Sequence, residues 1–223
     1  MNRDEQVSRA RALAPRRRWT GMRASLYPSE VGGGTWIGTS NAGLSLALVN
    51  WYAKPQRDRA LCVSRGIIIP HLLAAENLAE VAAMFADLPL AKINPFRLIA
   101  ASLKERRLCE WRWDGKRLTC SRFGWKRRHW FSSGYDEALA NKKRAAAVRD
   151  IVKSAPASLR KLHRSHLPDQ GPFSICMHRE DARTVSYTEI VAARLDVTMR
   201  YAAGSPCTGK LGAPRLLSFA SRA

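Results

Sequence analysis

The sequence predicts an α+β domain, and three observations lead to that class. Residues 96–100 and 108–113 alternate apolar and polar side chains, as half-buried strands do. Residues 77–85 instead repeat apolar side chains at helical spacing. With 223 residues and 46% hydrophobic content, the chain is long enough to bury one continuous core. We assign the domain to residues 1–207 and expect a loosely ordered tail at 208–223, where periodicity is weak.

The chain begins with a basic segment that we predict to be an irregular connection. Residues 9–31 contain Pro15 and Pro28, which interrupt regular structure. The densest cluster of positive charge, Arg16-Arg17-Arg18 beside Trp19, lies within it. A hairpin should follow, with strands at 35–37 and 44–51 around turn residues 40–43. One face of the second strand should point to the core, because three leucines alternate there with smaller residues: Leu44, Leu46 and Leu48.

Two helices are predicted next. Ser64 can cap a short helix whose regularity is limited by Pro70. Asn77 and Glu80 have the spacing of a capping box at the start of a second helix, which should end at 88–89.

The middle of the chain is predicted to be sheet. Asp114-Gly115 is a strong hairpin signal between the strand at 108–113 and a return strand at 118–122. Trp111 and Trp113 are two residues apart and should therefore share one face. Packing in the core explains this pair better than stacking on a ligand.

The last third of the chain should combine helices and strands. Residues 130–133 are expected on, or just after, a strand. We further predict helices at 136–152 and 158–166 and strands at 173–178, 184–188 and 197–201.

Composition limits the possible classes of function. The formal net charge is +20, which would attract nucleic acid, anionic membranes or acidic ligands. The arginines are scattered, however, and no helix-turn-helix, RRM or KH pattern is present, so no specific nucleic-acid partner is expected. No apolar run is long enough to span a bilayer. Asp4 and Glu5 exclude a signal peptide at the start, which favours a cytoplasmic protein.

Cysteine and histidine give only local signals. The chain has five cysteines without CxxC spacing, which argues against a disulfide framework or a structural zinc site, and we predict no metal. His163 and His166 could share a helix face, but surface histidines explain them better. Cys176 and His178, two residues apart on a predicted strand, could bind a metal or haem iron, or act as thiol and base. Burial in the core is the simpler interpretation of that pair.

Several short motifs occur in the order seen in one known family. Asn2-Arg3-Asp4-Glu5 is followed by Gly33-Gly34-Thr35-Trp36, the most specific pairing. Further matches are Ser64-Arg65-Gly66, Asn94-Pro95-Phe96, Trp130-Phe131-Ser132-Ser133, Cys176-Met177-His178-Arg179, Arg183-Thr184-Val185-Ser186 and Pro206-Cys207. Together they resemble the NRDE family, whose animal members are called transport and Golgi organisation proteins.

The resemblance implies an N-terminal-nucleophile hydrolase-like fold, a four-layer αββα sandwich of two antiparallel sheets between helices. Enzymes of this kind cleave carbon–nitrogen amide bonds with a nucleophile at the first position of a strand. Here Asn2 follows Met1, and a carboxamide cannot replace a thiolate. Either the start is assigned too late, so that a first strand is missing and Asn2-Arg3-Asp4-Glu5 is the bend after it, or this form has lost catalysis.

The resemblance also implies roles for single residues. Asp4 matches the aspartate of related acylases, Asn50 is the candidate oxyanion donor, and Arg183 matches a late arginine. Ser133 falls where those acylases have an asparagine. Asn2 and Trp36 complete the candidate contacts to a small-molecule amide.

The alternative function is that of a carrier, which would hold haem or another hydrophobic anion in a cleft between the two sheets. Cys176 and His178 are then the candidate haem contacts, and Arg3, Arg65 and Arg183 could bind carboxylates. Each arginine is equally explained by a structural pair with an acid such as Asp4 or Asp181.

Overall fold

The structure is a computed structural model that describes residues 1–20, 22–149 and 156–219. The chain forms two compact units, each assembled from separate segments. Unit 1 comprises Met1–Arg11, Arg127–Glu189 and Arg200–Ala213. Unit 2 comprises Ala12–Lys126, Ile190–Met199 and Pro214–Ala223. Within the described residues, no helix is both long and apolar enough to cross a membrane.

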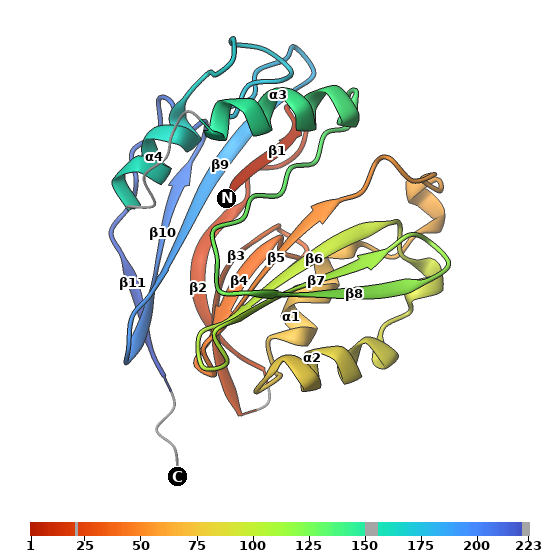
Figure 1. Cartoon of the computed structure of the whole chain (residues 1–223), viewed down its shortest axis with the longest axis vertical. Coiled ribbons are helices and arrows are strands. Elements are labelled where there is room, and N and C mark those ends of the chain that lie inside the picture. The colour runs from red at the N-terminus through yellow and green to blue at the C-terminus, as the bar shows by residue number, and fades with distance from the viewer. Residues whose placement is uncertain (21, 150–155, 220–223) are drawn as a thin grey trace. The chain divides into compact units, whose positions relative to one another are not determined.

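Unit 2 contains a seven-stranded antiparallel sheet in which the strands follow one another in chain order (Figure 1). Its strands are β2 (Leu13–Thr20), β3 (Arg23–Ser29), β4 (Ile37–Ser40), β5 (Leu44–Asn50), β6 (Phe96–Ser102), β7 (Arg107–Trp113) and β8 (Leu118–Gly124). The predicted hairpins around residues 41–43 and Asp114-Gly115 are confirmed. Most neighbouring strands are joined by short turns, whereas residues 51–95, between β5 and β6, form a long connection that contains helices.

Short helices cover one face of this sheet. They are η1 (Arg59–Leu61), η2 (Arg65–Ile67), α1 (Ile68–Leu72), α2 (Leu78–Met84), η3 (Phe85–Asp87) and η4 (Leu90–Lys92). Both predicted caps are confirmed, because Ser64 Oγ accepts from Gly66 N at 3.1 Å and Asn77 Oδ1 accepts from Glu80 N at 2.9 Å. The Glu80 carboxylate accepts from Glu76 N, not from Asn77 N as in a full capping box.

The largest core lies between these helices and the sheet. As predicted, Leu44, Leu46 and Leu48 of β5 are buried there, while Ser45 and Ala47 are partly exposed. Trp111 and Trp113 join the same cluster from β7, which confirms the packing interpretation. A second cluster of unit 2 combines Ala24 and Leu26 of β3 with Val197, Met199 and Leu217.

The prediction of an irregular connection at residues 9–31 was wrong. β2 and β3 form a hairpin there, and the register shifts between Leu13 and Arg16, next to Pro15. β2 is an edge strand of its sheet, where proline is tolerated because one row of backbone N–H groups is unpaired. Arginines on such an edge also disfavour pairing with other chains.

A four-stranded antiparallel sheet has the order β1-β9-β10-β11. Its strands are β1 (Asn2–Gln6), β9 (Ala182–Ala192), β10 (Asp196–Ala203) and β11 (Arg215–Ser218). Asn2-Arg3-Asp4-Glu5 is therefore a strand and not the expected bend, although the register shifts between Arg3 and Asp4. The predicted strands at 184–188 and 197–201 lie within β9 and β10. β11 occupies part of the segment expected to be a loose tail, and its Leu217 is buried.

Unit 1 also contains two helices, α3 (Glu137–Arg149) and α4 (Pro156–Arg164). The helix predicted at 136–152 agrees with α3, and residues 150–152 lie outside the described part of the chain. The strand expected at 173–178 is wrong, and so is the placement of residues 130–133 on or just after a strand, because both segments are irregular connections and β8 ends at Gly124. Their backbone groups form hydrogen bonds with side chains or with other connections, not with a neighbouring strand. Ser132 O accepts from Arg144, and Ile175 N donates to Leu167 O.

Candidate functional site

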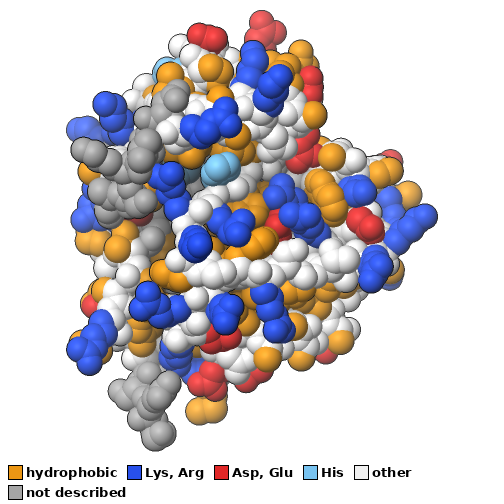
Figure 2. Space-filling view, in the orientation of Figure 1, with side chains coloured by type: hydrophobic (Ala, Val, Ile, Leu, Met, Phe, Trp, Pro, Cys, Tyr) orange, Lys and Arg blue, Asp and Glu red, His pale blue; other side chains and the backbone are white. Residues whose placement is uncertain are grey.

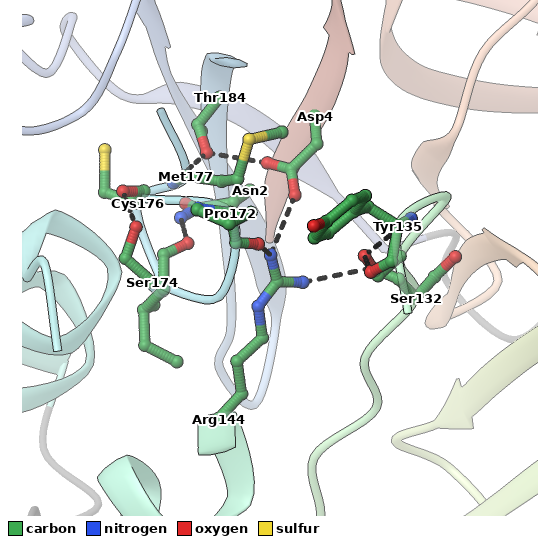
Figure 3. A network of polar contacts seen from close by, with 12 residues as sticks. Asn2, Asp4, Ser132, Tyr135, Arg144, Pro172, Ser174, Cys176, Met177 and Thr184 are labelled. Carbon is green, nitrogen blue, oxygen red and sulfur yellow. Dashed lines mark hydrogen bonds and ion pairs between the residues drawn. The ribbon is translucent and has the colours of Figure 1, made fainter. Parts of the chain in front are cut away.

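The candidate site of unit 1 is a polar network around Asp4 (Figure 3). The Thr184 hydroxyl donates to Asp4 Oδ1 at 2.6 Å, and Arg144 Nη2 lies 3.5 Å from Asp4 Oδ2. Met177 N donates in turn to Thr184 Oγ1 at 2.8 Å. The four members come from four different segments, namely β1, β9, α3 and the connection before β9. The arrangement fixes the orientation of the Asp4 carboxyl.

Arg144 is a member of this site that the sequence analysis missed. Its guanidinium donates to Ser132 O at 3.0 Å and to Pro172 O at 3.4 Å, in addition to its pair with Asp4. Only 5% of the Arg144 side chain is exposed. The available signal was its position on the helix, because Arg144 lies at helical spacing between the buried residues Ala140 and Val148.

Burial and the neighbouring groups shift the pKa of Asp4 in opposite directions. Loss of surrounding solvent raises the pKa of Asp4, although Arg144 and the hydrogen bond from Thr184 act to lower it. The carboxyl is nevertheless accessible, since 28% of the side chain is exposed. Asp4 can therefore accept a hydrogen bond from a ligand without giving up its protein partners.

Arg183, predicted to share a site with Asp4, does not point toward it. Asp4 pairs with Thr184 and Glu5 pairs with Arg183 in the β1–β9 register. Neighbouring residues of a strand point to opposite faces, and Thr184 is buried whereas Arg183 is exposed. The register therefore separates Arg183 from the face that carries Asp4.

Three other predicted contacts in unit 1 have structural partners. Asn2 Nδ2 donates to His163 O at 3.0 Å and to Ile175 O at 2.8 Å, which ties β1 to α4. Arg3 is buried and pairs with Glu5 at 3.2 Å. Ser133 Oγ donates to Tyr135 O at 2.6 Å in a local turn.

The remaining predicted contacts belong to unit 2. Asn50, at the end of β5, donates from Nδ2 to Tyr52 Oη at 2.7 Å. Trp36 is buried just before β4. Arg65 donates to Pro95 O at 2.9 Å and to Gln56 Oε1 at 3.4 Å.

Cys176 and His178 form part of a second group in unit 1. Cys176 Sγ and Cys207 Sγ lie 3.6 and 3.5 Å from His178 Nε2, and the His166 ring is edge-on to the His178 ring at 5.0 Å. Burial raises the pKa of the Cys176 thiol to about 12, with Cys207 contributing. Burial has the opposite effect on His178, whose pKa it lowers, and the nearby His166 and Arg183 lower it further. As a free thiol, Cys176 is therefore protonated at neutral pH.

The Cys176–His178 pair could contribute to a metal site. Cys176 Sγ and His178 Nε2 are 3.6 Å apart, a separation that suits neighbouring ligands of one small ion.

Comparison with known proteins identifies the fold and the family. The structure is similar to that of a penicillin V acylase from Agrobacterium tumefaciens, with a TM-score of 0.50, 16% sequence identity, and coverage of 93% of this chain and 80% of that chain. This likeness confirms the α+β, N-terminal-nucleophile hydrolase-like fold class. No curated protein sequence matches the chain. The sequence pattern of the family described as Transport and Golgi organisation 2 matches residues 1–158, so the chain belongs to that family.

Proposed function

We propose that this protein binds a small-molecule amide at Asp4, in a site derived from that of an amide hydrolase. The main observation behind the proposal is that the Asp4 carboxyl is both oriented and accessible. Thr184 and Arg144 orient it, and 28% of the Asp4 side chain is exposed. A carboxylate held in this way is a preorganised acceptor for an amide N–H group. The structural likeness to a penicillin V acylase indicates which amides to try first.

Binding without cleavage fits the residues near Asp4. An amide hydrolase of this fold needs an activated nucleophile, and Asn2 carries a carboxamide whose nitrogen donates to two backbone carbonyls. The buried Cys176 thiol, whose pKa is raised to about 12, is not a thiolate at neutral pH. We therefore expect the residues around Asp4 to bind an amide and to leave it intact.

The test measures binding and turnover of penicillin V by the same protein. Isothermal titration should give saturable binding to the wild type, and Asp4→Asn should weaken it roughly tenfold or more, because a hydrogen bond to a charged group is lost. Asp181→Asn is the matched control, since Asp181 is an exposed acid of the same unit whose partner is Arg179. Thermal unfolding should first establish that both variants are folded.

Two results would contradict the proposal. Equal affinity of the wild type and Asp4→Asn, or no saturable binding, would remove Asp4 as a ligand contact. Release of the free amine from penicillin V would show that the site is catalytic, and the claim of binding without cleavage would fail.

Haem or another hydrophobic anion is the alternative ligand class predicted from the sequence. Its candidate contacts are Cys176 and His178, whose Sγ and Nε2 atoms lie 3.6 Å apart, and the carboxylate-binding arginines, of which Arg3 also pairs with Glu5. A hemin titration of the same protein is the direct test, with a shifted Soret band as the positive result. The cytoplasmic location also stays a prediction.

A further inference from the structure

Four metal-binding side chains converge in unit 1, and one of them, His178, interacts electrostatically with the Asp4 carboxyl. They are His166, Cys176, His178 and Cys207, and one ligand atom of each lies within 4.8 Å of all the others. His166 follows helix α4, Cys176 and His178 lie in the connection before β9, and Cys207 lies after β10. The four residues are thus brought together by the fold, which is why short sequence spacings did not reveal the group. All four lie beyond residues 1–158, the part that matches the family.

The distances suit a tetrahedral ion with two sulfur and two nitrogen ligands. With Zn–S bonds of about 2.3 Å and Zn–N bonds of about 2.0–2.1 Å, neighbouring S and N ligands are about 3.6 Å apart and two S ligands about 3.8 Å apart. Cys176 Sγ and Cys207 Sγ lie 3.6 and 3.5 Å from His178 Nε2. The widest pair, within 4.8 Å, needs to close by only about an ångström, which side-chain rotation can provide.

The polar atoms of the group also need a partner. Cys176 is fully buried, and the other three side chains are partly buried. His166 Nε2 is buried and has no hydrogen-bond partner among the described residues. A buried nitrogen without a partner costs free energy, and coordination of an ion is one way to remove that cost.

Hydrogen bonds hold the backbone at three of the four ligands. Cys176 N donates to Ser165 O at 2.9 Å, which joins the connection before β9 to the end of α4. The Ser174 hydroxyl donates to Cys176 O at 2.6 Å, and Arg164 Nη2 donates to Cys207 O at 3.2 Å. His178 N donates to Gly171 O at 3.2 Å. These bonds fix the backbone from which the Cys176, His178 and Cys207 side chains project.

We propose that His166, Cys176, His178 and Cys207 bind one zinc ion in a structural site. Tetrahedral coordination by two sulfurs and two nitrogens is typical of zinc, and four protein ligands leave no open position for catalysis. Two thiolates also balance the charge of a divalent ion. The ion would connect the end of α4, the connection before β9 and the turn after β10. Asp4 interacts with His178 but is not one of the four ligands, so zinc binding can be measured separately from amide binding.

The first test is metal content and binding. The full chain, purified under reducing conditions without a histidine tag, should contain about one zinc ion per molecule by mass spectrometry, or take up one from ZnCl2. Chelation should lower the thermal unfolding temperature, because the ion binds only the folded chain. Cys207→Ser should lose the zinc, whereas Cys120→Ser should keep it, since Cys120 is an exposed cysteine of unit 2. A protein that takes up no zinc contradicts the proposal.

The second test uses only the wild type and so does not depend on the folding of a variant. Zinc should slow alkylation of the partly exposed Cys207 roughly tenfold or more, because a coordinated sulfur is a poor nucleophile, and should leave Cys120 unaffected. Peptide mass spectrometry gives the extent of labelling at each cysteine. Equal labelling with and without zinc, or a Cys176–Cys207 disulfide in the protein as isolated under non-reducing conditions, would overturn the zinc site.

Discussion

Glu110 is a buried carboxylate that forms ion pairs with two arginines. Only 1% of its side chain is exposed, yet Arg97 Nε lies 2.6 Å from Oε1 and Arg112 Nη2 lies 2.8 Å from Oε2. Burial disfavours the charged form, but the hydrogen bonds from Arg112 and Arg97 outweigh it, so the pKa of Glu110 lies below its ordinary value. A lowered pKa means that the ionised carboxylate stabilises the folded state.

The first prediction concerns the pH dependence of this contribution. It should be complete above the pKa of an unfolded glutamate, about 4.3, and should be lost as the pH falls through the lower pKa of the folded state. Glu110→Gln should therefore lower the free energy of unfolding at pH 7 by about 1–3 kcal/mol. The difference from the wild type should shrink in acid. Urea unfolding at a series of pH values measures both quantities.

Glu180→Gln is the control for this experiment, because Glu180 is an exposed carboxylate. It should change the stability by no more than about 0.5 kcal/mol. A wild-type advantage over Glu110→Gln that persists unchanged well below pH 4 would show that packing, and not charge, stabilises this position.

At the scale of residues, the sequence singled out Asp4, which the fold places in a polar network, but it did not predict the partners Thr184 and Arg144. Thr184 and Arg144 come from segments far from Asp4 in the chain, and only the folded register brings them together. An arginine inside an alanine-rich helix also looks like an ordinary solvent-facing charge. Convergence of this kind depends on tertiary contacts, which spacing along the chain does not encode.

At the scale of elements, two motif glycines allow a close backbone contact. A Cβ at Gly66 would lie 2.9 Å from Gly34 Cα, and a Cβ at Gly34 would lie 3.1 Å from Gly66 Cα. Thr35 N donates to Gly66 O at 3.0 Å across the same contact. The glycines of two family-like motifs thus fix helix η2 beside the residues that lead into β4.

The second prediction follows from that contact. Gly66→Ala should destabilise unit 2 by about 1–3 kcal/mol, because the added methyl group must displace the backbone of Gly34. Gly32→Ala is the matched control, since a Cβ there meets nothing within 4 Å, and it should change stability by no more than about 0.5 kcal/mol. Denaturant unfolding is the measurement. A Gly66→Ala variant as stable as the wild type would show that the two segments separate at little cost.

The elements that the sequence predicted best have strong local signals. The leucine alternation of β5, the Asp114-Gly115 turn and the Asn77 cap each depend on neighbours within a few residues. The elements that it missed depend on position in the sheet. β2 contains Pro15 and three arginines, which are compatible with a strand only at an edge, and an edge position is set by the fold.

At the scale of the whole molecule, the net charge of +20 is its strongest global property. Figure 2 shows Lys and Arg side chains spread over the face in view and mixed with hydrophobic and acidic ones. Some arginines already have aromatic partners, with Arg17 5.2 Å from the ring of Trp19 and Arg18 5.1 Å from that of Tyr27. A dispersed positive field attracts polyanions without reading their sequence.

The third prediction is that DNA binds this protein weakly, without sequence preference and with strong dependence on salt. Two unrelated duplexes of equal length should have the same affinity, because phosphate contacts carry no sequence information. Both affinities should fall steeply, by roughly 10³-fold or more if six or more phosphates are contacted, between about 50 and 200 mM salt. Fluorescence anisotropy over a salt series measures this slope. A duplex preferred by roughly tenfold or more at the higher salt concentration would contradict the prediction, since such a preference requires contacts to base edges.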